Sequence, residues 1–261
     1  MSSYSREQTL VLIKPDALKL ALTGYILSSL AEPHTGLRLA SSKIVHVSDT
    51  LAKEHYAEHR GKPFFSELID YLCGRIHETE GYKRRVIALV YYGTDAVANI
   101  RAKTGPTNPL VARDKAPWTI RALGALIPNS AQLQCSSRMD NLVHASASLE
   151  DAEREIKLWF RPRDICPDVR AWQSVICDEH YYCNEAGCLT TTYRDGVTCL
   201  LAPGKPVWKS DLDLLRDIVA GGGDDPRIWR VAAKYLINNA PADAGQVPTH
   251  QSDVGYRDVA V

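Results

Sequence analysis

Three short apolar runs, separated by helix-like segments, set the fold class of this chain. TLVLIKPDAL (9–18) is a leucine and β-branched run that stops at Pro15-Asp16, LRLASSKIVHV (37–47) alternates as a strand does, and RVIALVYYG (85–93) ends at Gly93. NLVHASAS (141–148) is a fourth, weaker strand candidate. Helices are predicted at 23–30, 49–59, 63–72, 94–103 and 151–160, with caps or first-turn residues at Ser48, Pro63, Thr94 and Asp95.

This order of elements predicts a ferredoxin-like βαββαβ fold of the α/β (α+β) class. Its antiparallel sheet is expected to carry helices on one face, and the domain is expected to span residues 1–162. The character of the chain changes after PRDICPD (162–168). We expect a small, mainly helical, cysteine-containing extension over 163–239 and a polar, flexible tail over 240–261. The extension's two helices are DLDLLRDIVA, capped by Ser210 and stopped by Gly221 to Gly223, and RIWRVAAKYLINN, started by Pro226.

Charge and hydropathy exclude several classes of partner. Lys plus Arg and Asp plus Glu both number 31, so the net charge implies no polyanion, and no nucleic-acid partner is expected. The longest apolar runs, such as VIALVYY (86–92), are too short to span a bilayer, and MSSYSREQ lacks the layout of a signal peptide. We therefore predict a cytoplasmic protein without a membrane partner.

Several polar residues lie at positions where folding alone does not require a polar side chain. His144 lies within the fourth strand candidate, and Lys14 ends the first strand beside a proline. Arg101, Lys103, Thr107 and Arg121 bracket a Gly-Pro-Thr-Asn-Pro loop, and arginines with a hydroxyl suit phosphate oxygens. Taken singly, each also fits an ordinary role: a buried histidine satisfied by one hydrogen bond, or a solvated surface charge.

Taken together, these fragments resemble one family. VLIKPDAL, HYAEHRGKPFF, IRAKTGPTNP, TIR (119–121), NLVHASAS and EREIKLWF occur in the order found in nucleoside diphosphate kinase, over about residues 6–162. The resemblance implies a phosphotransferase that moves the γ-phosphate of a nucleoside triphosphate to a nucleoside diphosphate through phosphohistidine, in a ping-pong cycle. Nucleoside di- and triphosphates are then the partners, with Mg²⁺ carried by the nucleotide phosphates and no protein ligand assigned to it.

The same resemblance implies roles for individual residues. His144 matches the phosphorylated histidine, and Glu155 matches the carboxylate that holds its other ring nitrogen. Tyr56 lies beside the reacting phosphate, Phe64 matches the aromatic on which the base stacks, and Asn141 matches the sugar contact. Phosphate and ribose contacts are matched by Lys14, Arg101, Thr107 and Arg121, and more weakly by His55.

Elementary chemistry agrees with these roles. Phosphoryl transfer needs positioning and positive charge, which a lysine, two arginines and Mg²⁺ supply. Histidine, with a free pKa of about 6.5, offers an unprotonated nitrogen at neutral pH, and a carboxylate on the other nitrogen fixes its tautomer. Asn141 has the opposite strand parity to His144, so both reach one nucleotide only if Asn141 precedes the regular strand.

Two departures from the family pattern leave alternatives open. The family's Gly-Ser-Asp after the histidine is Ala145-Ser146-Ala147 here, which adds a methyl and removes a carboxylate. Stretches before the third strand and between Arg121 and Asn141 are longer than usual. Because the second lies where the family packs its subunits together, we expect a homo-oligomer smaller than the family's hexamer, with a dimer as the candidate. The alternatives are a catalytically weak nucleotide-binding regulatory module and a kinase for a specialised nucleotide.

The extension contains five of the seven cysteines. Cys177, His180, Cys183 and Cys188 are spaced closely enough to surround a Zn²⁺ ion, with Cys199 or Cys166 as substitute ligands. The spacing matches no standard finger or ribbon. Reduced cysteines in a packed extension are therefore the favoured interpretation, and zinc is the alternative.

Overall fold

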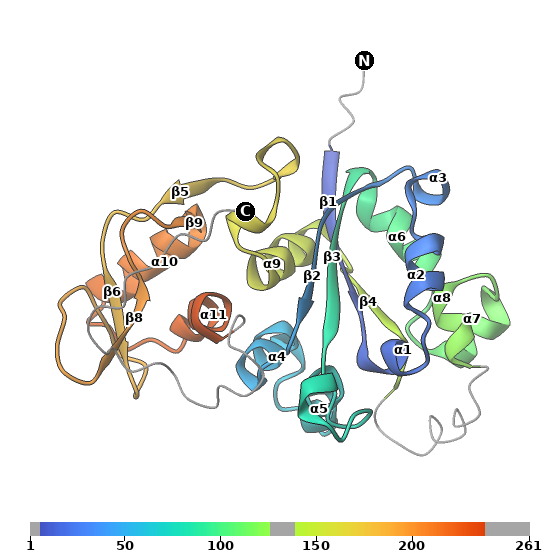
Figure 1. The fold of residues 1–261 in the computed structure, drawn as a ribbon, viewed down its shortest axis with the longest axis horizontal. Helices are drawn as coiled ribbons and strands as arrows, with labels where there is room; N and C mark the ends of the chain where they lie inside the picture. The colour runs from blue at the N-terminus through green and yellow to red at the C-terminus, as the bar shows by residue number, and fades with distance from the viewer. Residues whose placement is uncertain (1–5, 126–138, 238–261) are drawn as a thin grey trace.

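The N-terminal part of the chain is a four-stranded antiparallel sheet between two layers of helices (Figure 1). The computed structural model describes residues 6–125 and 139–237. The strands are β1 (Arg6–Ile13), β2 (Arg38–Val45), β3 (Val86–Thr94) and β4 (Val143–Ala145). Their order, β2-β3-β1-β4, confirms the ferredoxin-like fold expected from the element pattern.

The helices cover both faces of the sheet, which corrects the prediction of one covered face. One layer holds α1 (Pro15–Lys19), α2 (Thr23–Ser29), α3 (Glu32–Thr35), α6 (Ala96–Thr104), α7 (Pro109–Lys115) and α8 (Ile120–Gly124) (Figure 1). The other holds α4 (Asp49–His55), α5 (Phe65–Leu72) and α9 (Leu149–Trp159). The physical reason is visible in β1, where Leu10 to Ile13 are all apolar and buried, as in strands covered on both sides.

Local caps explain where the helices of the second layer begin. The Ser48 hydroxyl accepts from the backbone N–H of Leu51, as the sequence predicts, and Ser148 caps α9 in the same way through Asp151. The helix expected from Pro63 begins at Phe65 instead. Asp95 precedes α6, but its side chain makes no capping bond.

The C-terminal extension is an α+β unit rather than a mainly helical one. It holds β5 (Ser174–Ile176), β6 (Tyr181–Asn184), β7 (Leu189–Thr190), β8 (Val197–Leu201) and β9 (Pro206–Trp208). The two predicted helices are present as α10 (Lys209–Ala220) and α11 (Ile228–Ala232), the latter continuing as a π-helical turn over Ala233–Ile237. Trp208, not Ser210, is the N-cap residue of α10. Hydrophobic periodicity does not predict these strands because they have only two to five residues.

The extension shares a hydrophobic core with the sheet domain. Trp208 and Ala233 are buried in the cluster that contains Trp159, Phe160 and Ile165. The indole Nε1–H of Trp208 donates to the carbonyl of Phe160 at 2.8 Å. A second core, around Tyr181, Leu215 and Val231, lies within the extension itself. The two parts are therefore packed as one body, although the boundary predicted at residue 162 stays a prediction.

Two further expectations from the sequence concern membrane spans and the C-terminal tail. Within residues 6–125 and 139–237, no helix is long and apolar enough to cross a membrane. The tail predicted over 240–261 lies outside the described residues.

Candidate active site

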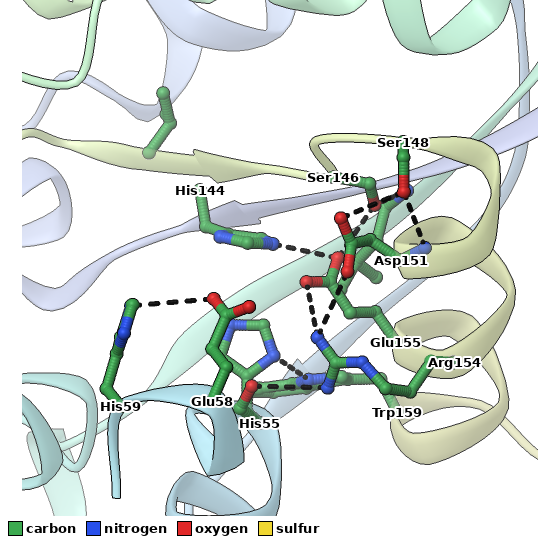
Figure 2. Close-up of polar contacts among 12 residues, drawn as sticks. His55, Glu58, His59, His144, Ser146, Ser148, Asp151, Arg154, Glu155 and Trp159 are labelled. Atoms are coloured by element: carbon green, nitrogen blue, oxygen red, sulfur yellow. Dashed lines mark hydrogen bonds and ion pairs between the residues drawn. The ribbon is translucent and has the colours of Figure 1, made fainter.

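His144 projects from the short strand β4 toward the layer formed by α4 and α9 (Figure 2). Its strand partner is Leu12, whose side chain belongs to the core on that side of the sheet. The His144 Nε2 atom lies 2.9 Å from Oε2 of Glu155, which follows on α9. The side chain of His144 is 18% exposed, and that of Glu155 is 4% exposed. The His144 ring is thus held by Glu155 on one side and partly exposed to solvent.

The Glu155 carboxylate is held by several donors. Ser146 donates its hydroxyl to Oε2 at 2.7 Å, and Arg154 approaches Oε1 at 3.4 Å (Figure 2). Burial alone would raise the pKa of Glu155, but the charge and hydrogen bond of His144, with help from His55 and Ser146, lower it to about 2. Glu155 is therefore an ionised partner that can stabilise positive charge on the imidazole.

Lys14 follows the end of β1 and is almost completely buried. Its Nζ donates to Oδ1 of Asn141 at 2.8 Å and lies 4.9 Å from the centre of the Tyr71 ring. Burial lowers the pKa of Lys14 to about 8, although Asp16 acts in the opposite direction. The surface lysine considered as an alternative is excluded by this burial.

Asn141 and Leu142 form a tight turn just before β4. The Asn141 N–H donates to the Tyr71 hydroxyl at 3.2 Å, and the Leu142 N–H donates to Oδ2 of Asp16 at 2.9 Å. Leu142 has φ +67°, an uncommon conformation for a large side chain. This confirms that Asn141 precedes the regular strand, which is the condition for Asn141 and His144 to reach one ligand.

Arg121, at the start of α8, is buried and fixed by backbone carbonyls. Its Nη1 donates to Gly105 at 2.7 Å and its Nη2 donates to Val143 at 3.1 Å. Burial, together with the charge of Arg101, lowers the pKa of Arg121 to about 10. Gly105 has φ +82°, and a Cβ there would lie 2.2 Å from Oγ1 of Thr119, so only glycine fits this turn.

Arg101 and Thr107 are exposed and mark the open side of the site. The Thr107 carbonyl accepts from Nδ2 of Asn141 at 3.0 Å, which ties the Gly-Pro-Thr-Asn-Pro loop to the turn before β4. The structure therefore connects the loop to the histidine strand, as the fragment order implies.

Aromatic and imidazole rings gather at the end of α4 and in the segment that follows it. Tyr56 is buried, and among the described residues its hydroxyl has no hydrogen-bond partner. The rings of Tyr56 and His59 stack with centroids 6.0 Å apart, and His59 meets Phe64 edge-on at 5.7 Å. His55 is buried against His144, with ring centroids 4.5 Å apart. Burial and the charge of Lys62 lower the pKa of His59, although Glu58 acts in the opposite direction.

The sequence did not single out five residues that complete this arrangement. Tyr71 and Asp16 hold the 141–142 turn, Ser146 and Arg154 hold Glu155, and His59 lies between Tyr56 and Phe64. Asp16, His59, Ser146 and Arg154 all stand inside the quoted fragments. Tyr71 gave no signal, because it reads as one more apolar residue of a helix.

The zinc hypothesis is not supported by the geometry. His180 stacks on Tyr182, while Cys183 is buried on the other face of β6, so their ligand atoms diverge. The Cys177 and Cys183 thiols instead donate to the nearby carbonyls of Glu179 and Asn184. Cys73, Cys166, Cys177, Cys183, Cys188 and Cys199 are all free thiols. Within the described part of the chain, the group with three potential metal ligands is His55, His144 and Glu155.

A partly exposed histidine held by a carboxylate, beside a buried lysine and a buried arginine, is suited to phosphoryl transfer. The family model for nucleoside diphosphate kinase matches residues 7–165. The chain belongs to the nucleoside diphosphate kinase family, whose members are enzymes.

Individual relatives agree with this assignment. The nucleoside diphosphate kinase of Pyrococcus furiosus is 40% identical over 159 residues, which are 61% of this chain and 86% of the relative. That of Mycolicibacterium smegmatis is 44% identical over 155 residues, covering 59% of this chain and 94% of the relative. Both matches leave more than a third of this chain uncovered.

Solved structures are similar over a comparable share of the chain. The nucleoside diphosphate kinase of Aquifex aeolicus has a TM-score of 0.51 and 31% identity, covering 62% of this chain and all of that one. The enzyme of Borrelia burgdorferi, solved as a transition-state mimic with vanadate and ADP, has a TM-score of 0.52 and 26% identity, covering 64% and 94%.

Proposed function

We propose that this protein transfers the γ-phosphate of a nucleoside triphosphate to a nucleoside diphosphate through a phosphohistidine at His144. The observation that most directly supports this proposal is the 2.9 Å contact between His144 Nε2 and Oε2 of Glu155. Because this contact occupies Nε2, Nδ1 is the nitrogen left to react.

The reaction balances in two steps. The Nδ1 lone pair attacks the γ-phosphorus, the bond to the β,γ-bridging oxygen breaks, and a nucleoside diphosphate leaves. A terminal oxygen of a second diphosphate then attacks the phosphorus, the P–N bond breaks, and the imidazole returns to its neutral form. Glu155 stabilises the positive charge that the imidazole carries in between.

The remaining residues bind and orient. Lys14 and Arg121 offer positive charge to phosphate oxygens, with Arg101 and Thr107 at the open side. The Tyr56 hydroxyl, which has no hydrogen-bond partner among the described residues, is available to the reacting phosphoryl group, and Phe64 offers a face on which any base can stack. Asn141 contacts the sugar, and His55 contacts phosphate.

Mg²⁺ is part of the proposed substrate rather than a resident of the protein. The described residues around His144 are mostly N–H donors, and the one carboxylate beside it is already bound, so they form no oxygen cage of the kind Mg²⁺ takes from proteins. An ion carried by the nucleotide would neutralise phosphate charge.

The dimer expected from the sequence stays a prediction.

Labelling with γ-³²P-ATP tests this function. Wild-type protein should acquire acid-labile, alkali-stable label, and His144→Ala should acquire none. His180→Ala, which alters an exposed histidine of the extension, is the matched control and should label like wild type. An unlabelled wild type would leave only the regulatory-module alternative, and release of label by one diphosphate alone would favour the specialised kinase.

A further inference from the structure

Residues 74–85 join α5 to β3 and form one of the two stretches that are longer than the family pattern. We call this segment the insertion loop. The loop is bonded to itself, because Nε of Arg84 donates to the carbonyl of Glu78 at 2.9 Å and Nη2 of Arg84 donates to that of Thr79 at 3.0 Å. It is therefore a shaped element whose outward contacts have fixed directions.

Two ion pairs fasten the insertion loop to helices that border the site. Oε1 of Glu78 lies 3.2 Å from Nζ of Lys19, at the end of α1, and α1 begins directly after Lys14. Arg75 pairs with Asp49, at the start of α4. At least one partner in each pair is well exposed, so the two pairs contribute little stability. They show that the loop lies beside both helices.

A third contact, made by His77, reaches the turn that carries Asn141. Nε2 of His77 lies 3.1 Å from Oδ2 of Asp140, the residue directly before Asn141, and the two side chains are only 17% and 24% exposed. The His77 ring also meets the Tyr71 ring edge-on, with centroids 5.5 Å apart. Because both partners are largely withdrawn from water, the contact with Asp140 is screened less than the two exposed pairs.

Tyr71 connects His77 to residues that the proposed function assigns to the nucleotide. The buried Tyr71 ring lies 4.9 Å from Nζ of Lys14, and the Tyr71 hydroxyl accepts the N–H of Asn141 at 3.2 Å. Oδ1 of Asn141 in turn accepts from Lys14 at 2.8 Å. Burial lowers the pKa of Lys14, and the charge of Asp140 is among those that act in the opposite direction. His77 therefore contacts both residues through which this group is held.

We infer that His77 is a positioning residue for the nucleotide site. By contacting Asp140 and Tyr71, it fixes the direction in which two ligand-binding side chains point. These are Asn141, proposed to contact the sugar, and Lys14, proposed to contact phosphate. The inference rests on the proposed function, and it adds a loop outside the family pattern to the parts of the chain that determine nucleotide affinity.

Calorimetric titration with ADP tests this role without catalysis, because ADP alone brings no γ-phosphate to transfer. His77→Leu should weaken ADP binding about tenfold, as expected when one member of a contact network is removed. His77→Gln keeps an N–H donor near the position of Nε2 and should bind within about threefold of wild type. Equal weakening in the two variants, at equal thermal stability, would overturn the inference.

A matched control lies in the same loop. Glu80 pairs with Lys83 on the exposed side of the insertion loop, away from the contact with Asp140. Glu80→Gln removes that pair and should bind ADP like wild type. A loss equal to that of His77→Leu would mean that any disturbance of the loop weakens binding, which contradicts a specific role for His77.

A double-mutant cycle tests whether His77 acts through Asp140. If it does, the double variant His77→Leu/Asp140→Asn should bind ADP within about threefold of the weaker single variant, because the second change removes a contact that is already lost. Losses that multiply would show that the two residues act independently, and would contradict the inference.

Labelling kinetics separate binding from chemistry. In His77→Leu, the ATP concentration for half-maximal phosphohistidine formation should rise about tenfold while the maximal rate stays within about threefold, because β4 and α9 supply the contact between His144 and Glu155. A slower maximal rate with unchanged half-saturation would overturn the positioning role. If wild-type protein binds ADP but acquires no label, the proposed function fails, and the ADP affinities still decide the role of His77.

Discussion

Oε2 of Glu155 lies 2.9 Å from Nε2 of His144, so one carboxylate oxygen holds one nitrogen of the imidazole. The two ring nitrogens therefore differ in role, because Nε2 is held and Nδ1 is left to react. Since Glu155 lies on the helix that directly follows β4, the strand that carries His144 and the helix that orients it are joined by only three residues.

Replacing Glu155 by Gln should slow the formation of phosphohistidine 10- to 100-fold. Glutamine keeps the shape but cannot stabilise an imidazolium, and partners of this kind are typically worth about 10–100-fold. Rapid-quench labelling with γ-³²P-ATP measures the rate. Glu153→Gln, on the exposed side of α9, is the control, and a rate within twofold of wild type for Glu155→Gln would contradict the assignment.

The value of kcat/KM should decline as the pH rises through about 8. Burial lowers the pKa of Lys14 to about 8 from an ordinary 10.5, so its ammonium loses its proton in this range and the phosphates lose a positive partner. A bound phosphate favours the charged form, so kcat should decline only at higher pH. Steady-state rates from pH 6.5 to 10 check this, and Lys14→Met should lack the decline on a lower baseline. A profile that stays flat beyond pH 9.5 would refute it.

Ala145→Gly should lower stability while leaving activity within threefold. The Ala145 methyl is buried opposite Val11, on the face of the sheet away from His144, so it fills the core rather than crowding the site. Losing a buried methyl and adding glycine flexibility costs about 1–2 kcal/mol. Urea unfolding and kcat/KM test the two parts. A tenfold rise in activity would show instead that the methyl slows His144.

Trp208→Ala should destabilise the whole chain, not the extension alone. Trp208 is fully buried with Trp159 and Phe160, and removing a buried tryptophan costs about 3–5 kcal/mol. Thermal unfolding monitored by circular dichroism should show one transition at a lower midpoint. Trp118→Ala, at a 76% exposed position, should leave the midpoint unchanged. Two separate transitions would mean that the sheet domain and the extension unfold independently.

How far the sequence predicts this structure depends on the length of its signals. The long apolar runs around Leu12 and Leu89 predict the sheet. The fragment order groups Lys14 and Arg121 with His144, and in the structure Lys14 contacts Asn141 while Arg121 contacts the carbonyl of Val143, next to His144. Helices on the second face of the sheet were not predicted, although the apolar residues Leu10 to Ile13 give β1 no polar face toward solvent. The two-to-five-residue strands of the extension were also missed, because such runs carry little periodicity.

The finer contacts could not be read from the sequence for a different reason. The hydrogen bonds from the Asn141 N–H to Tyr71 and from the Trp159 indole to His55 join residues 70 and 104 positions apart. Nothing in local pattern reports such pairs, since each residue alone fits a core position. The cysteines of the extension show the limit of spacing as a signal. Close spacing in sequence allowed zinc as the alternative, but His180 stacks on Tyr182 while Cys183 is buried.

The shared core around Trp208 would hold two fragments of the chain together after a cleavage in the extension. Thr191 to Gly196 form an exposed turn within the extension, which is the kind of segment that proteases cut. A nick there would leave Trp208 and Ala233 in the cluster that contains Phe160, with Arg161 still donating to the carbonyls of Lys234 and Tyr235. The two fragments would remain a non-covalent pair, so this turn is a natural breakpoint for fragment complementation.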